Sequence, residues 1–247
     1  MPPYAPHKRF IAPAIGSSFG AVLMVIVAME LSFFLTPLLV TVFLPDSLAI
    51  AFETGDTPLS ALAQLISFGL IAASLWVLVR GLHGRGFWSM VGPVTPTIRH
   101  MKIAGMAVFW LLLVRQFLPP FIVFDELALT RPVIGWAIWI VPTIGALIIQ
   151  AGTEELYFRG YLQQQFAVVS DSKWVWMGLP SLLFGLGHYL NGFGPADSLL
   201  YGLWATLLGL ACADLTARTG NIGAAIGLHV SNNLFAFMIV SEIDMPS

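Results

Sequence analysis

The sequence contains few charged residues. Asp, Glu, Lys and Arg make up 10% of its 247 residues, whereas hydrophobic residues make up 57% and the mean hydropathy is +0.85. A soluble domain usually carries about 25% charged residues. A soluble fold of this length cannot bury so much apolar surface, so the composition excludes a soluble protein and indicates a polytopic membrane protein.

The small net charge and the single cysteine exclude further classes of function. The 11 basic and 13 acidic residues nearly balance, which argues against a nucleic-acid partner. Cys212 is the only cysteine, which excludes an internal disulfide and a cysteine-based zinc site. We interpret Cys212 as a small packing residue in a helix.

Long hydrophobic runs, by contrast, are abundant. A membrane-spanning helix needs about 20 mostly apolar residues, and backbone polar groups in lipid must be paired within the helix. We therefore predict an all-α, polytopic transmembrane helix bundle with about seven spans, in a range of six to eight. The expected spans are Phe19–Leu44, Leu59–Val79, Ile103–Phe124, Pro132–Ala151, Trp174–Leu190, Ser198–Ala213 and Ile222–Val240.

The distribution of basic residues predicts a cytoplasmic N-terminus. In that orientation nine of the eleven Lys and Arg residues, Arg159 among them, lie in cytoplasmic segments. His7, His83 and His100 fall in the same segments, where a solvated or interfacial position is the default. We expect an integral multi-pass protein of the lipid bilayer, in the plasma (inner) membrane of a bacterium.

Two adjacent carboxylates end the fourth apolar run. Glu155 and Arg159 are four residues apart and share a helix face, so we predict a supporting ion pair between them. Glu154 points about 100° away and lacks that partner. Because a buried, unpaired carboxylate can take a proton from water, we interpret Glu154 as a general base.

Two histidines lie inside later spans and should face the bundle interior. His188 shares a helix face with Phe184, and His229 shares one with Asn233. An Asn and a His that point together into a dry cavity can donate hydrogen bonds to an oxyanion. Hydrogen bonding between helices is the structural alternative.

In chain order these residues form three patterns, Glu-Glu-x-x-x-Arg, Phe-x-x-x-His and His-x-x-x-Asn. The set resembles the motifs of the CPBP intramembrane proteases, also called Abi or type II CAAX prenyl endopeptidase-like proteins. The resemblance covers roughly Trp136 to Val240. We therefore expect an N-terminal part of about three spans without recognised motifs (residues 1–131), a catalytic membrane core similar to this family (132–240) and a short tail (241–247).

The resemblance implies hydrolysis of a peptide bond in a membrane-associated peptide or protein, such as a prenylated CAAX tail. Glu154 would activate a water that His188 positions, and His229 and Asn233 would stabilise the oxyanion. The implied supporting residues are Glu155, Arg159 and Phe184. A non-catalytic binding protein, such as an immunity factor or a transporter, is the alternative, although it would have little need for all these polar groups.

A metal is a separate question. The family is commonly labelled metalloprotease, and Glu154, His188 and His229 would be a plausible zinc set. However, the sequence lacks a His-Glu-x-x-His arrangement with a separate base. If Glu154 bound the metal, Glu155 would have to be the base, but Glu155 is better explained as the ion-pair partner of Arg159. Water activation by Glu154 without a metal therefore needs fewer assumptions. Zinc is the alternative cofactor.

Counting along the spans does not place the motifs at one depth. At 1.5 Å per residue, His188 lies about 22 Å from the start of its span and His229 about 13 Å from Gly220. Glu154 falls at the inner end of the fourth span. One solution is that Trp174 begins below the membrane surface, and another is that the helix carrying Glu154 continues beyond Arg159.

Overall fold

The computed structural model describes residues 4–119, 133–192 and 194–238. Within these ranges the chain is a helical bundle without strands, which confirms the predicted fold class. The long helices are α2 (Phe19–Val42), α4 (Pro58–His83), α6 (Val94–Arg115), α7 (Val133–Tyr157), α10 (Pro195–Thr219) and α11 (Gly223–Met238). The shorter ones are α1 (Ala5–Ile11), α3 (Asp46–Thr54), α5 (Trp88–Val91), α8 (Gln163–Val169) and α9 (Leu179–His188).

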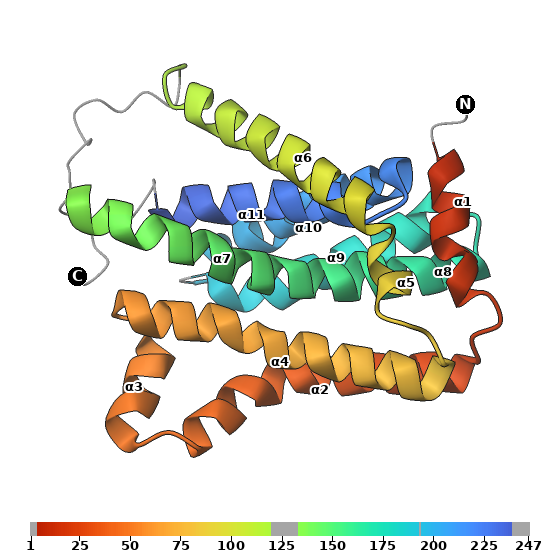
Figure 1. Cartoon of the computed structure of the whole chain (residues 1–247), viewed down its shortest axis with the longest axis horizontal. Helices are drawn as coiled ribbons and strands as arrows, with labels where there is room; N and C mark the ends of the chain where they lie inside the picture. Colours follow the sequence, from red (N-terminus) through yellow and green to blue (C-terminus); the bar gives the residue numbers. More distant parts are fainter. Residues whose placement is uncertain (1–3, 120–132, 193, 239–247) are drawn as a thin grey trace.

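Helix α7 lies in the middle of the bundle. In Figure 1, α2 and α4 lie on one side of it and α6 and α11 on the other, and both α4 and α11 contact it directly. The Phe33 ring of α2 packs against Phe68 and Tyr157, with centroids 6.2 and 5.8 Å away. The Thr153 hydroxyl donates to the Phe68 carbonyl at 3.1 Å. The N-terminal helices therefore hold α7 beside Glu154.

In the described part of the chain, five helical stretches are long and apolar enough to cross a membrane. They are Phe19–Val42, Pro58–His83, Val94–Arg115, Val133–Val169 and Pro195–Thr219. The two other predicted spans correspond to the consecutive helical segments η4, α9 and η5 (Trp174–Gly178, Leu179–His188 and Tyr189–Asn191) and to α11, whose described part ends at Met238. Neither is among the five stretches, so a count of seven spans is not confirmed.

The helix that carries the fourth predicted span continues past Ala151, where that span was predicted to end. Helix α7 continues through a π-helical turn, η3 (Phe158–Leu162), into α8, and the whole stretch has 37 residues. Arg159 is therefore a fully buried residue inside this helical stretch. In the sequence, paired charges inside a bundle resemble the end of an apolar helix.

Helix α6 also differs from its prediction, since it begins at Val94 instead of Ile103. Arg99 and Lys102 in its first turns lower the local hydropathy without ending the helix. Its predicted end at Phe124, like the ends of the fourth and seventh spans at Pro132 and Val240, lies outside the described residues. The predicted tail, residues 241–247, also lies outside them.

Helices α6 and α11 approach each other closely through glycine. A Cβ atom on Gly227 would lie 2.2 Å from the Met101 carbonyl oxygen, closer than any real contact. The Ser231 hydroxyl donates to the Gly105 carbonyl at 2.8 Å across the same interface. Small residues allow such backbone approach between membrane helices, and here they fix the position of α11.

The N-terminal helix α1 packs against α8 and α10. The Tyr4 hydroxyl donates to Asp214 Oδ1 at 2.6 Å, and the His7 ring lies 4.5 Å from that of Trp176. His7 Nε2 accepts a weak hydrogen bond from Gln163 at 3.5 Å. His7 is thus buried, contrary to the solvated or interfacial position expected from the sequence.

The Gly227 contact makes a prediction about stability. Replacing Gly227 with alanine should push α6 and α11 apart and lower the free energy of unfolding by about 1–3 kcal/mol, because the methyl group meets backbone. Gly145→Ala is the matched control, since no heavy atom lies within 4 Å of its Cβ position. Thermal unfolding in detergent compares them, and equal melting temperatures for the two variants would contradict the close packing.

The burial of His7 predicts how the stability of the fold depends on pH. Burial lowers the pKa of His7 from 6.5 to about 4, so the unfolded chain binds more protons between these values. The stability contributed by neutral His7 is complete above pH 6.5 and falls, by up to about 3 kcal/mol, as the pH drops towards 4. Melting temperatures from pH 4.5 to 7.5 should decline less steeply towards acid in His7→Phe. An unchanged slope would show that His7 does not titrate in this way.

Candidate active site

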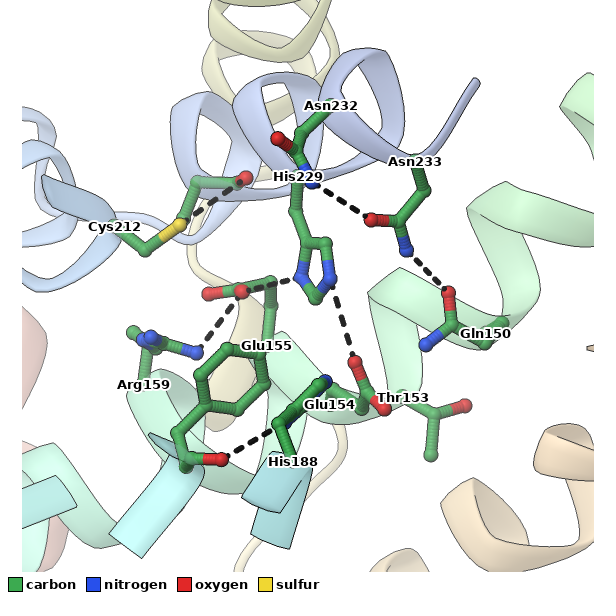
Figure 2. A network of polar contacts seen from close by, with 12 residues as sticks. Gln150, Thr153, Glu154, Glu155, Arg159, His188, Cys212, His229, Asn232 and Asn233 are labelled. Carbon is green, nitrogen blue, oxygen red and sulfur yellow. Dashed lines mark hydrogen bonds and ion pairs between the residues drawn. The ribbon is translucent and has the colours of Figure 1, made fainter. Parts of the chain in front are cut away.

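A cluster of polar side chains lies where α7, η3, α9 and α11 meet. Figure 2 shows these side chains pointing towards one another from separate helices. Helix α7 supplies Gln150, Thr153, Glu154 and Glu155, and the other elements supply Arg159, Phe184, His188, His229, Asn232 and Asn233. All the residues that the sequence selected for a site are in this region.

The Glu155 carboxylate links two of the motifs. Its Oε1 atom accepts hydrogen bonds from Arg159 Nη1 and from His229 Nδ1, both at 2.9 Å. Glu155 and Arg159 have no exposed surface, and His229 has 1%. The structure confirms the ion pair with Arg159, and it shows a second partner that the sequence did not predict. Glu155 thereby orients the His229 ring.

The π-helical turn explains how Arg159 stays inside the bundle. In η3 the Gln163 N–H bonds to the Phe158 carbonyl, five residues back, so the helix accommodates one extra residue per turn. Every residue from Phe158 to Leu162 is buried as a result. The guanidinium carbon of Arg159 lies 4.8 Å from the centroid of the Phe184 ring, which provides a favourable cation–π contact.

Glu154 faces the other nitrogen of the same imidazole. Its Oε2 atom lies 3.4 Å from His229 Nε2, and the residue is 7% exposed. Oε2 makes no hydrogen bond within the described residues. Figure 2 shows His229 between the two adjacent glutamates. The carboxylates therefore have the separate environments that the helix geometry predicted, because only Glu155 contacts Arg159.

His188 completes the cluster from the end of α9. Its Nδ1–H donates to the Phe184 carbonyl at 2.8 Å, so in the neutral ring Nε2 carries the free lone pair. The His188 side chain is half-buried. The Phe184 ring packs 4.4 Å from His188 and 5.5 Å from His229, beside the site as predicted.

Asn233 is on the same side of α11 but has different partners from His229. Its Nδ2 donates to Gln150 Oε1 at 3.0 Å, and its Oδ1 accepts from Asn232 Nδ2 at 3.1 Å. The sequence prediction placed His229 and Asn233 on one face, and both do point towards α7 (Figure 2).

Counting along the spans placed Glu154, His188 and His229 at different depths, and the structure shows why that count fails. Glu154 is an interior residue of the long stretch Val133–Val169, and not the last residue of a span. Helix α9 is preceded by the π-helical turn η4 (Trp174–Gly178). Of the two solutions that the sequence offered, the structure confirms the continuation beyond Arg159.

Comparison with known proteins matches the region that contains the cluster. Residues 135–235 match the family model described as type II CAAX prenyl endopeptidase Rce1-like. This part of the chain, fewer than half of its 247 residues, is Rce1-like. The three motifs lie inside the matched residues, so the resemblance drawn from them is confirmed there.

One curated relative extends the similarity. The chain is 26% identical over 170 residues to an uncharacterized protein, YyaK, of Bacillus subtilis (strain 168). The alignment covers 68% of this chain and 57% of that relative. No solved structure matches the chain.

Two of the three predicted zinc ligands lie close together in the cluster. Glu154 and His229 present two donor atoms 3.4 Å apart. A zinc site with an open position needs three protein ligands, and among the described residues no three His, Cys, Asp or Glu side chains gather around one point. His188, the third predicted ligand, donates from Nδ1 to the Phe184 carbonyl, which leaves its Nε2 atom free.

Sequence reasoning missed one residue of the cluster, Gln150. Its side chain is 7% exposed and its Oε1 atom accepts a hydrogen bond from Asn233 Nδ2 at 3.0 Å. A signal was present, since Gln150 is an amide inside an apolar run, one helical turn before Glu154 and on the same face. Its hydrogen-bond partner could not be predicted from the sequence, because Asn233 is distant along the chain.

The buried ion pair generates a third prediction. Arg159→Met leaves the Glu155 carboxylate without its cation and should lower the free energy of unfolding by about 3–5 kcal/mol. Arg218→Met is the control, because Arg218 also pairs with a carboxylate four residues away, but the two side chains are 52% and 31% exposed. The control should change the melting temperature little. Equal losses in the two variants would refute the structural role of Glu155–Arg159.

Proposed function

We propose that this protein is an intramembrane endopeptidase that hydrolyses a peptide bond of a membrane-associated substrate. The observation that carries the proposal is the position of His229 between Glu154 and Glu155, in a cluster where the His188 side chain is half-buried. The five described helical stretches with the length and composition of membrane spans agree with this activity, and so does the Rce1-like match.

In the proposed reaction Glu154 is the general base. A water molecule that donates one hydrogen bond to Glu154 and the other to His188 Nε2 is held with its oxygen free to attack. His188 can accept that bond because Nδ1–H is committed to the Phe184 carbonyl. As the water oxygen attacks the peptide carbonyl carbon, its proton passes to Glu154.

The proposed oxyanion hole consists of His229 and Asn233. With Nδ1–H donated to Glu155, His229 has only Nε2 available for the oxyanion, and it donates from there when the ring is protonated. The formal charges of Glu154, Glu155, Arg159 and a protonated His229 sum to zero, which suits a buried cluster. The second N–H of the Asn233 amide supplies the other donor.

Collapse of the tetrahedral intermediate completes the reaction. The C–N bond breaks, and the proton held by Glu154 moves to the leaving nitrogen, which gives one new carboxyl group and one new amine. Every proton transfer in this scheme uses Glu154, so we propose that the site works without a metal. Zinc is measured in the test below, because metal-assisted hydrolysis is the competing mechanism.

We propose a prenylated peptide with a CAAX-type C-terminus as the first substrate to test, on the strength of the family match. The bilayer would hold the lipid group while the peptide reaches the half-buried side of the cluster. We expect the protein in the plasma membrane of a bacterium, as the sequence predicted.

The decisive variant is Glu154→Gln in purified protein reconstituted into liposomes. Cleavage of a panel containing a prenylated CAAX peptide, its unprenylated form and an unrelated membrane peptide should fall by about 10²–10⁴-fold, since the amide cannot take the water proton. Glu53→Gln in α3 is the control, because Glu53 is exposed and far along the chain from the motifs.

Two results would contradict the proposal. Unchanged cleavage in Glu154→Gln excludes it as the base. Stoichiometric zinc in the active protein that is lost in His188→Ala replaces the metal-free mechanism with a metal-dependent one.

A further inference from the structure

Helix α2 carries one charged residue, Glu30, which no step of the proposed reaction uses. Glu30 lies midway along α2, a stretch of 24 residues with the length and composition of a membrane span. The residue is exposed on the surface of the bundle. An ionisable side chain is costly near the centre of a membrane helix and usually marks a functional position, so Glu30 calls for a partner.

The partner of Glu30 within the protein is Tyr157. The Tyr157 hydroxyl donates to Glu30 Oε1 at 3.0 Å, and the tyrosine itself has no exposed surface. Within the described ranges this is the one hydrogen bond of the Glu30 side chain, and no basic side chain forms an ion pair with it. A neutral hydroxyl leaves the negative charge of the carboxylate without a counter-charge.

The position of Tyr157 places Glu30 beside the proposed base. Tyr157 and Phe158 follow Glu154 by three and four residues. At about 100° per residue, Tyr157 lies about 60° to one side of Glu154 and Phe158 about 40° to the other. Tyr157 bonds to Glu30 of α2. Phe158 packs on Phe184 of α9, with ring centroids 5.1 Å apart. Glu154 therefore points between α2 and α9, and Glu30 lies at the α2 edge of this side of α7.

A row of rings extends from Glu30 to His188 across the same side of α7. Successive ring centroids from Tyr157 through Phe158 and Phe184 to His188 lie 4.9, 5.1 and 4.4 Å apart. The first three rings are buried. The residues at the two ends differ, because Glu30 is exposed and His188 is half-buried. A peptide that lies along the row can therefore touch both ends.

The charge of Glu30 decides which group of a peptide fits there. The proposed reaction keeps the cluster around Glu154 neutral, so the cluster supplies no net positive charge to Glu30. A cation is the group that compensates a carboxylate, and the attraction is stronger in surroundings of low dielectric constant than in water. Lysine and arginine have long apolar stems that can carry a cation along a lipid-facing surface.

We propose that Glu30 is a specificity-determining residue, which pairs with a lysine or arginine side chain of the peptide substrate. This inference rests on the proposed peptidase function, and it names the substrate class as a membrane-associated peptide with a basic residue close to the scissile bond. Tyr157 begins about 4.5 Å along the helix axis from Glu154, and its side chain adds to that length. Because an extended peptide advances about 3.3 Å per residue, the basic residue should lie within about four residues of the scissile bond.

A set of matched peptides tests the proposal. In one membrane-associated parent peptide, each of about four residues on either side of the scissile bond is replaced in turn by Lys, Leu or Glu. At one position or at neighbouring ones, the wild type should cleave the Lys peptide with kcat/KM at least about 10-fold above the Glu peptide. In Glu30→Gln that ratio should fall below about twofold. Cleavage by the wild type with a ratio near one at every position would overturn the proposal.

Charge reversal separates recognition from a structural role. In Glu30→Lys the Glu peptide should be cleaved about 10-fold better than the Lys peptide at the same position. If the contact with Tyr157 only holds α2 against α7, the variant slows all peptides alike and the ratio stays as in the wild type, which contradicts the proposal. Should Glu30→Lys fail to fold, the ratio in Glu30→Gln decides.

Glu53→Gln is the matched control, because it removes an exposed carboxylate from α3. It should leave the ratio of the Lys and Glu peptides as in the wild type. A drop equal to that in Glu30→Gln would attribute the preference to the overall charge of the protein and refute a specific site.

A binding measurement separates this inference from the proposed function. Fluorescent Lys and Glu peptides are titrated with the full-length protein in liposomes of neutral lipid. The Lys peptide should bind at least about 10-fold more tightly to the wild type and to Glu154→Gln, and the difference should disappear in Glu30→Gln. If it does so while no peptide is cleaved, the peptidase function fails and Glu30 still selects a basic ligand. If peptides are cleaved but both forms bind equally, the peptidase function stands and the role of Glu30 fails.

Discussion

One oxygen of the Glu155 carboxylate accepts hydrogen bonds from two side chains, Arg159 and His229, that lie far apart in the sequence. Arg159 and His229 both donate to it at 2.9 Å, in surroundings with almost no solvent exposure. A buried charge without such partners would be strongly destabilising, so this contact can persist only while α7, η3 and α11 keep their relative positions. The orientation of His229, and with it the geometry around Glu154, follows from that requirement.

The surrounding helices meet this requirement mainly through close backbone packing. Gly227 lets α11 rest against α6, and Gly185 does the same for α9 and α10, where a Cβ atom would lie 1.9 Å from Thr206 Oγ1. In a bilayer no hydrophobic force draws apolar helices together, so close packing and hydrogen bonds must do so. The glycines thus position the histidines without contacting them.

Much of the candidate site was predictable from the sequence because its signals are local. Glu155 and Arg159 are one helical turn apart, and Phe184 and His188 repeat that spacing, so the shared faces follow from helix periodicity. The bond between His229 and Glu155 and the bond between Asn233 and Gln150 were not predictable. They join residues on different helices, and no local pattern records which faces meet.

The sequence by itself determined a helical membrane protein and selected the residues of the cluster, because apolar content and helix periodicity act over one turn or one span. The tertiary structure alone decided where the fourth apolar helix ends, that His229 lies between the two glutamates, and that Asn233 bonds to Gln150. Hydropathy counts charges and cannot distinguish a charge in water from one paired inside the bundle. That distinction depends on the partner, and the partner is brought there by the packing of distant helices.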